Sequence, residues 1–169
     1  VDGKEYPGYG ETVVGKNDPS IVKYDEAKAK AKEMVNWYAG KQYDSDVAAA
    51  KRVLADLDTY YPGAKDYEVA GFFWWQGAKD CGNAVHSARY EQNLVRLIEQ
   101  LREDFRAPDA KFVCATLGQT KKDATGTHGQ IINAMFNVAD PEKYPENKGK
   151  VATFYTNPVS KGGSSSGHY

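Results

Sequence analysis

The sequence predicts an α/β fold in which helices sandwich a parallel sheet in three layers. Short apolar runs alternate with amphipathic segments in the order strand, helix, strand, helix, strand, which is typical of right-handed crossovers between parallel strands. The 169 residues carry a net charge of −1 and include 3 Trp, 12 Tyr and 6 Phe, whereas disordered chains combine high net charge with few aromatic residues. We therefore expect residues 1–169 to form a single folded domain.

The N-terminal part of the chain is predicted to be irregular at first and then helical. Residues 1–24 carry Gly and Pro at short intervals without an apolar period, which indicates irregular surface structure. Residues 25–32 alternate Ala and Lys and are expected to form a short exposed helix. A longer amphipathic helix is expected to begin at N-caps within residues 44–46 and to end before the Pro-Gly pair at 62–63. Its apolar face is formed by Val47, Ala50, Leu54, Leu57 and Tyr61.

The C-terminal part is predicted to contain the sheet and its crossover helices. Residues 67–75 and 111–117 are apolar runs that suit strands buried on both faces, and residues 151–155 are expected to form a third strand. Residues 90–105 place their apolar side chains on one helical face, and so do residues from about 127 to 138. Such sheets usually have about five or six strands. Part of the sheet is therefore expected to lie N-terminal to this chain, which makes the domain incomplete as given.

Charge and composition argue against several classes of partner. The 22 basic and 23 acidic residues create no positive field that would attract nucleic acid or anionic lipid. The longest apolar run, residues 69–75, is far shorter than the roughly 20 residues that span a bilayer. A structural zinc site is not expected, since Cys81 and Cys114 lie in no Cys-x-x-Cys or Cys/His metal-binding spacing. The two cysteines are interpreted either as small buried residues or as a disulfide bridge.

Candidate site residues follow the predicted strands, because ligands of open parallel sheets bind beyond the carboxyl ends of the strands. Gln76 comes just after the first strand and can donate amide hydrogens to a developing oxyanion. Gly77 would let its backbone N–H approach a ligand closely, and Trp74 and Trp75 would form walls of the site. The alternative is that both tryptophans belong to the core and that Gln76 only satisfies backbone groups.

The three histidines are candidate general bases, because imidazole titrates near neutral pH. His168 lies in a Gly- and Ser-rich segment after the last strand, where a general base would stand in an α/β hydrolytic site. His86 and His128 lie near helix starts and are interpreted as ordinary cap or surface residues.

Several segments taken together resemble one enzyme family. The most specific is the Trp-Gln-Gly block within residues 71–80. The others are residues 37–44, 89–94, 101–105, 107–108 and 112–118, and the likeness extends over about residues 36–169. On these segments the chain resembles the sialate O-acetylesterase-like carbohydrate esterases of the SGNH hydrolase superfamily.

The resemblance implies an SGNH-hydrolase or flavodoxin-like three-layer fold and the hydrolysis of acyl esters, often acetyl groups on sugars. It also implies that Gln76 matches the oxyanion-hole position of the family and that His168 matches its catalytic histidine. An enzyme of this type needs no metal or cofactor.

Some family features are missing from this sequence. The nucleophilic serine of the family lies in a Gly-Asp-Ser block, which does not occur in residues 1–169 and is therefore expected upstream. Ala78 and Ser165 stand where many relatives have acidic residues, so the acid that orients the histidine is unassigned. Asp80 is retained at its family position, where it can also serve only to hold its own loop.

The sequence therefore predicts the C-terminal part of a secreted or periplasmic carbohydrate esterase of the serine type. Its expected partners are an acylated carbohydrate and the remaining N-terminal part of the same domain. The alternative function is a non-catalytic glycan-binding or surface-assembly protein that retains the esterase fold.

Overall fold

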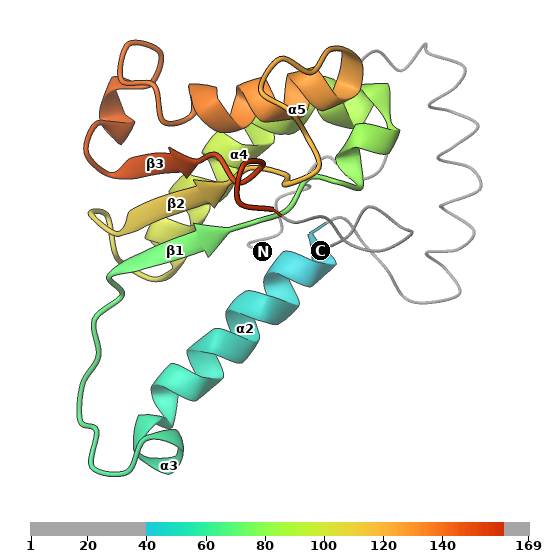
Figure 1. The fold of residues 1–169 in the computed structure, drawn as a ribbon. Coiled ribbons are helices and arrows are strands. Elements are labelled where there is room, and N and C mark those ends of the chain that lie inside the picture. Colours follow the sequence, from blue (N-terminus) through green and yellow to red (C-terminus); the bar gives the residue numbers. More distant parts are fainter. Residues whose placement is uncertain (1–39, 161–169) are drawn as a thin grey trace, which may run out of the picture. The chain divides into compact units, whose positions relative to one another are not determined.

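The computed structural model describes residues 40–160 of the chain (Figure 1). The chain divides into two compact units, Val1–Glu68 and Val69–Tyr169. The irregular segment and short helix expected within residues 1–32, and His168, lie outside the described residues. The expectation of a single domain over residues 1–169 stays a prediction.

The first unit contains a helix that begins earlier than the sequence predicts. Helix α2 spans Lys41–Ala55, and Gly40 precedes it with a left-handed backbone at φ 84°. The prediction of N-caps within residues 44–46 was wrong, because these residues lie inside the first turns of α2. Acidic side chains such as that of Asp44 also suit this position, since the helix N-terminus carries a partial positive charge.

The predicted amphipathic segment is also divided into two helices. Helix α3 spans Leu57–Tyr60, and Asp56 between α2 and α3 has a non-helical backbone, with φ −120° and ψ 47°. The N–H of Asp56 donates to the carbonyl oxygens of Arg52 and Val53 at 3.2 and 3.3 Å, which tightens the end of α2. The segment ends before the Pro-Gly pair, as predicted, and Gly63 there has φ 88°.

The second unit contains a parallel sheet with the strand order β1-β2-β3 (Figure 1). The strands are β1 (Gly71–Trp74), β2 (Lys111–Ala115) and β3 (Val151–Phe154). Phe72 pairs with Phe112, and Phe112 pairs with Val151. The three predicted strands and their parallel pairing are confirmed, although each strand is shorter than its predicted range.

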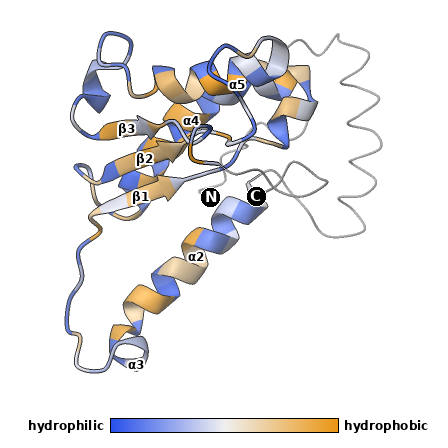
Figure 2. Cartoon of the chain, in the orientation of Figure 1, coloured by the Kyte–Doolittle hydropathy of each residue, from blue (hydrophilic) through white to orange (hydrophobic). Residues whose placement is uncertain are grey.

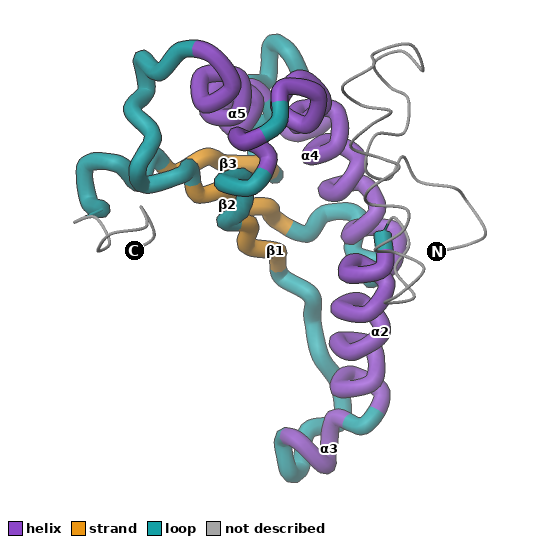
Figure 3. Tube along the Cα trace, turned by 90° about the vertical axis from the view of Figure 1, so that its right-hand side faces the viewer, coloured by secondary structure: helices purple, strands orange, loops and turns teal. Residues whose placement is uncertain are grey.

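Two helices connect the strands and cover the same face of the sheet (Figures 1 and 3). Helix α4 spans Ala84–Asp104 and begins at Asn83, whose side-chain oxygen accepts hydrogen bonds from two backbone N–H groups of the first turn. Helix α5 spans Gly126–Asn137. Strand order follows chain order, so two right-handed crossovers place both helices on one side. The core between helices and sheet includes Tyr90, Leu94, Ile98, Phe112, Cys114, Ile131, Met135, Val138 and Val151.

The opposite face of the sheet is exposed in this unit. Phe73, Val113 and Phe154 are 66, 37 and 55 % exposed. The prediction that residues 67–75 and 111–117 form strands buried on both faces was therefore wrong in this unit, because both crossover helices lie on the other side. The α/β class itself, a parallel sheet flanked by helices, is confirmed.

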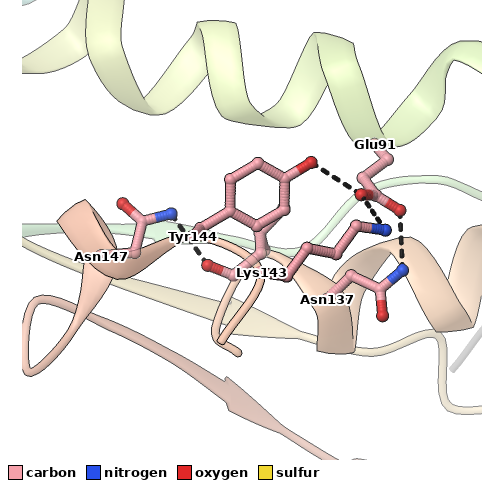
Figure 4. Close-up of polar contacts among 6 residues, drawn as sticks. Glu91, Asn137, Lys143, Tyr144 and Asn147 are labelled. Carbon is pink, nitrogen blue, oxygen red and sulfur yellow. Dashed lines mark hydrogen bonds and ion pairs between the residues drawn. The ribbon is translucent and has the colours of Figure 1, made fainter. Parts of the chain in front are cut away.

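A polar cluster ties α4 to the segment that follows α5 (Figure 4). The carboxylate of Glu91 accepts hydrogen bonds from Asn137 Nδ2 and Tyr144 Oη, each at 2.7 Å, and forms an ion pair with Lys143 Nζ at 2.6 Å. Burial alone would raise the pKa of Glu91, but the three donors together hold that pKa below its ordinary value. The cluster therefore favours the ionised carboxylate.

Hydropathy along the second unit follows this layering, since the strands are mostly apolar while the segments that connect them to the helices are mostly hydrophilic (Figure 2). Two short 3₁₀ helices, η1 (Asp80–Gly82) and η2 (Pro145–Asn147), complete the elements of this unit in the described range. Between residues 40 and 160, no helix is both long and apolar enough to cross a membrane.

Candidate active site

The carboxyl ends of β1, β2 and β3 lie at one edge of the parallel sheet (Figure 1). The segments that follow the strands, residues 75–80, 116–120 and 155–157, therefore meet at this edge. Open parallel sheets bind their ligands there. This edge is the candidate active site.

Gln76 has an exposed side chain just beyond the end of β1. Its Nε2 donates a hydrogen bond to Oδ2 of Asp80 at 2.7 Å. Asp80 begins η1, and its backbone N–H donates to the carbonyl oxygen of Gly77 at 3.1 Å. The amide that the sequence singled out therefore lies at the expected edge, where a carboxylate of its own loop holds it.

Tyr90 fixes the backbone of this loop from helix α4. Its buried hydroxyl donates to the carbonyl oxygen of Gln76 and accepts a hydrogen bond from Trp74 Nε1 at 3.0 Å. Burial raises the pKa of Tyr90 well above its ordinary value, so the hydroxyl stays protonated and remains a donor. Trp74 itself is half-buried and packs against the core.

Gly77 is buried and has φ 148°, a conformation that other residues rarely adopt. A Cβ atom at this position would lie 3.1 Å from side-chain atoms of Ile131 and Met135 and 3.2 Å from the Tyr90 hydroxyl. The absence of a side chain thus lets the loop pack closely onto α4 and α5. Approach of its N–H to a ligand stays a prediction.

A second network joins the ends of the three strands. The exposed Trp75 donates from Nε1 to the carbonyl oxygen of Thr116 at 3.0 Å. The backbone N–H of Thr156 donates to Thr116 Oγ1 at 3.0 Å, and the Thr156 hydroxyl donates to the same Thr116 carbonyl oxygen. Asn157 Nδ2 donates to the carbonyl oxygen of Gly118 at 2.6 Å. The strand ends are therefore held together on both sides of β2.

The histidines differ in position. His86 lies in the first turn of α4 and is half-buried, and His128 lies in the first turn of α5 with an exposed side chain. Both are near helix starts, as predicted. His168 lies outside the described residues, so its role as general base stays a prediction.

Both cysteines are free and buried. This confirms the interpretation of Cys81 and Cys114 as two small buried residues rather than a bridge. Burial raises the pKa of Cys114 to about 12, and burial together with the nearby Asp80 carboxylate raises the pKa of Cys81. Both thiols therefore stay protonated and unreactive near neutral pH.

Sequence reasoning missed three residues that organise this edge. Tyr90 was assigned only to the apolar face of a helix, and no local signal reveals that its hydroxyl reaches the loop after β1. Thr116 follows the end of β2 directly, and Thr156 lies two residues after the end of β3. A single Thr after an apolar strand belongs to no sequence motif and was therefore not singled out. The place of both threonines just after two neighbouring strands is the signal that would have found them.

No group of His, Cys, Asp or Glu side chains that could hold a metal ion occurs between residues 40 and 160. The chemistry offered by the described part of the edge is hydrogen-bond donation from an exposed, fixed amide beside an aromatic ring. An amide donor at the ligand-binding edge of an α/β sheet can donate a hydrogen bond to a negatively charged oxygen.

Comparison with known families shows the class of protein to which the chain belongs. Residues 26–148 match the family described as carbohydrate esterase, sialic acid-specific acetylesterase. The chain therefore belongs to this carbohydrate esterase family of the SGNH superfamily. The match includes Gln76 and its loop, whereas His168 lies beyond it. No curated protein and no solved structure matches the chain.

Proposed function

We propose that the chain is the C-terminal part of a serine-type carbohydrate acetylesterase whose nucleophilic serine lies N-terminal to Val1. Membership of a carbohydrate esterase family supports ester hydrolysis on sugars. The family's Gly-Asp-Ser block does not occur in residues 1–169, which is the reason for assigning the serine to a preceding segment.

The reaction follows the general scheme of serine hydrolases. The serine oxygen attacks the acetyl carbonyl carbon while His168 accepts the serine proton. The carbonyl oxygen becomes an oxyanion, and the Gln76 amide donates a hydrogen bond to it. Collapse breaks the ester bond, His168 gives the proton to the departing sugar hydroxyl, and water then releases acetate from the serine.

The observation that carries this proposal is the Gln76 amide, which is exposed and held in place at the carboxyl edge of the sheet. The exposed ring of Trp75 is the proposed surface for the sugar, since aromatic rings supply flat apolar area beside a polar tip. Trp74 and Gly77 support this surface by packing into the core and onto the helices.

The substrate class is an acetylated carbohydrate, and an O-acetylated sialic acid is the first candidate because of the family description. Secretion or export to the periplasm is the expected location for such an enzyme. The orienting acid is left open, because Ala78 and Ser165 stand at the positions where relatives carry acids.

The test uses the full-length protein, whose intact mass should exceed 18.7 kDa if a nucleophile segment precedes Val1. Acetate release is measured from 4-nitrophenyl acetate, an O-acetylated sialic acid and an acetylated neutral sugar. Gln76→Ala should lower kcat about 100- to 1,000-fold with little change in KM, because an oxyanion donor acts in the transition state.

His168→Ala should abolish hydrolysis, while His86→Ala and His128→Ala should leave it nearly intact. Full activity of His168→Ala, or an unchanged kcat of Gln76→Ala, would contradict the assigned roles. Sugar binding without any acetate release by the wild-type protein would instead favour the non-catalytic glycan-binding function.

A further inference from the structure

We infer that Asp80 is a positioning residue that orients the Gln76 side-chain amide toward the oxyanion. This inference rests on the proposed function, in which that amide meets the negative charge. It goes beyond the family match, because the geometry of the Gln76 and Asp80 side chains supplies it.

The hydrogen bond between the two side chains decides which end of the amide faces which way. A Gln side chain has a donor end and an acceptor end, and a carboxylate can only accept. The 2.7 Å contact with Asp80 therefore fixes the Nε2 end of Gln76 in the loop. One hydrogen on Nε2 is used by Asp80, and the other, which points in a different direction, remains for the substrate. The reversed amide would turn its oxygen toward the oxyanion and repel it.

Asp80 is suited to this task because its own backbone is fixed to helix α4. Its carbonyl oxygen accepts hydrogen bonds from the buried Ser87 Oγ at 2.9 Å and from the Asn83 N–H at 3.1 Å. The carboxylate therefore extends from an anchored segment, and the flexible Gln76 side chain gains a fixed partner. An amide held in advance does not have to be ordered during the reaction.

The charge of Asp80 cannot be its contribution. A carboxylate near a developing oxyanion repels it, so the benefit must come from geometry. An Asn at this position keeps an oxygen that accepts from Gln76 Nε2 and removes the charge. The variants Asp80→Ala and Asp80→Asn therefore separate a geometric role from an electrostatic one.

The experiment measures kcat and KM for acetate release by the full-length protein and its variants. Asp80→Ala should lower kcat about tenfold or more with KM within about twofold, and Asp80→Asn should recover kcat to within about threefold of the wild type. In a Gln76→Ala background, Asp80→Ala should change kcat by less than about twofold, because the group it positions is gone. Asp123→Ala, which removes an exposed carboxylate from the segment after β2, is the matched control and should leave kcat unchanged.

Three kinetic results would overturn the inference alone: normal kcat in Asp80→Ala, an equal loss of kcat in the Gln76→Ala background, or no recovery in Asp80→Asn. If Asp80→Ala does not fold, the inference is tested by NMR of the wild-type protein, which measures hydrogen exchange of the Gln76 side-chain amide. One Gln76 side-chain amide hydrogen should be protected from exchange, and equal fast exchange of both would overturn the inference. Absence of hydrolysis by the wild-type protein would overturn the proposed function and the inference with it.

Discussion

At the scale of single residues, Tyr90 has several roles at the candidate site. Its hydroxyl links the Trp74 indole to the Gln76 carbonyl oxygen, and it also lies next to the position that a side chain at Gly77 would occupy. The Tyr90 ring packs in the core, while its hydroxyl donates a hydrogen bond to the loop after β1. One side chain thus couples the packing of α4 to the placement of the candidate oxyanion donor.

Tyr90→Phe should lower the free energy of unfolding by about 1–3 kcal/mol, because the Trp74 N–H and the Gln76 carbonyl lose a partner in a partly buried place. Urea denaturation measures this loss. Tyr67→Phe is the matched control, since Tyr67 is 50 % exposed, and it should change the same free energy by less than about 0.5 kcal/mol. Equal effects of the two substitutions would show that the Tyr90 hydroxyl adds nothing to stability.

At the scale of elements, Glu91 connects α4 to the last residue of α5 and to the segment that follows it (Figure 4). Lys143 is 46 % exposed, so its ion pair with Glu91 is screened and adds little. The hydrogen bonds from Asn137 and Tyr144 are therefore the main contribution. They also require the charged form of Glu91, since an ionised carboxylate accepts several donors at once.

Glu91→Gln should lower the free energy of unfolding by about 1–3 kcal/mol at pH 7, because a neutral amide cannot replace the carboxylate as acceptor for all of its donors. The pKa of Glu91 is depressed in the folded state, so its stabilising effect is present above the ordinary value of 4.5 and is lost as pH falls through the folded pKa. Urea denaturation between pH 7 and pH 3 should therefore show that the difference in free energy of unfolding between Glu91→Gln and the wild type becomes smaller below about pH 4.5.

Glu142→Gln is the control for this series, because Glu142 is an exposed carboxylate in the same segment. It should behave like the wild type at every pH. If the difference in free energy of unfolding between Glu91→Gln and the wild type stayed constant down to pH 3, the charged carboxylate would not be the source of the stabilisation.

At the scale of the whole molecule, the two faces of the sheet differ in burial. Phe112 on the helix-covered face is 1 % exposed, whereas Phe73 on the other face is 66 % exposed. Phe112→Ala should lower the free energy of unfolding by about 3–5 kcal/mol. Phe73→Ala should lower it by less than about 1 kcal/mol, since little area is removed from contact. Urea denaturation measures both losses, and equal losses of free energy of unfolding in the two variants would contradict the difference between the two faces.

The sequence could predict the strands and crossover helices because their signals are local. Leu94 and Ile98 reveal the inward face of α4 by their spacing, and the apolar run around Phe112 reveals a strand. Which face of the sheet is covered depends on strand order, which composition does not encode. The start of α2 was misplaced because residues that cap helices also suit a first turn.

The candidate site was predictable in place but not in detail. Gln76 could be singled out because it follows a strand and stands in a recognisable block. Its bond to Asp80 is local, but the conformation of the loop that brings the two side chains together has no sequence pattern. The bonds of Tyr90 join two different elements and depend on how α4 lies against the sheet.

The order of the strands also bears on how the second unit forms during synthesis. Within residues 69–160, β1 leaves the ribosome first, β2 pairs with β1, and β3 pairs with β2. Each new strand therefore meets a neighbour that is already made, and no strand in this range has to be inserted between two others. Helix α4 is synthesised between β1 and β2 and helix α5 between β2 and β3, so each helix can pack on its face of the sheet soon after the strand before it is made. The sheet of this unit can thus form by adding strands in the order β1, β2, β3 at one edge while the chain is being synthesised.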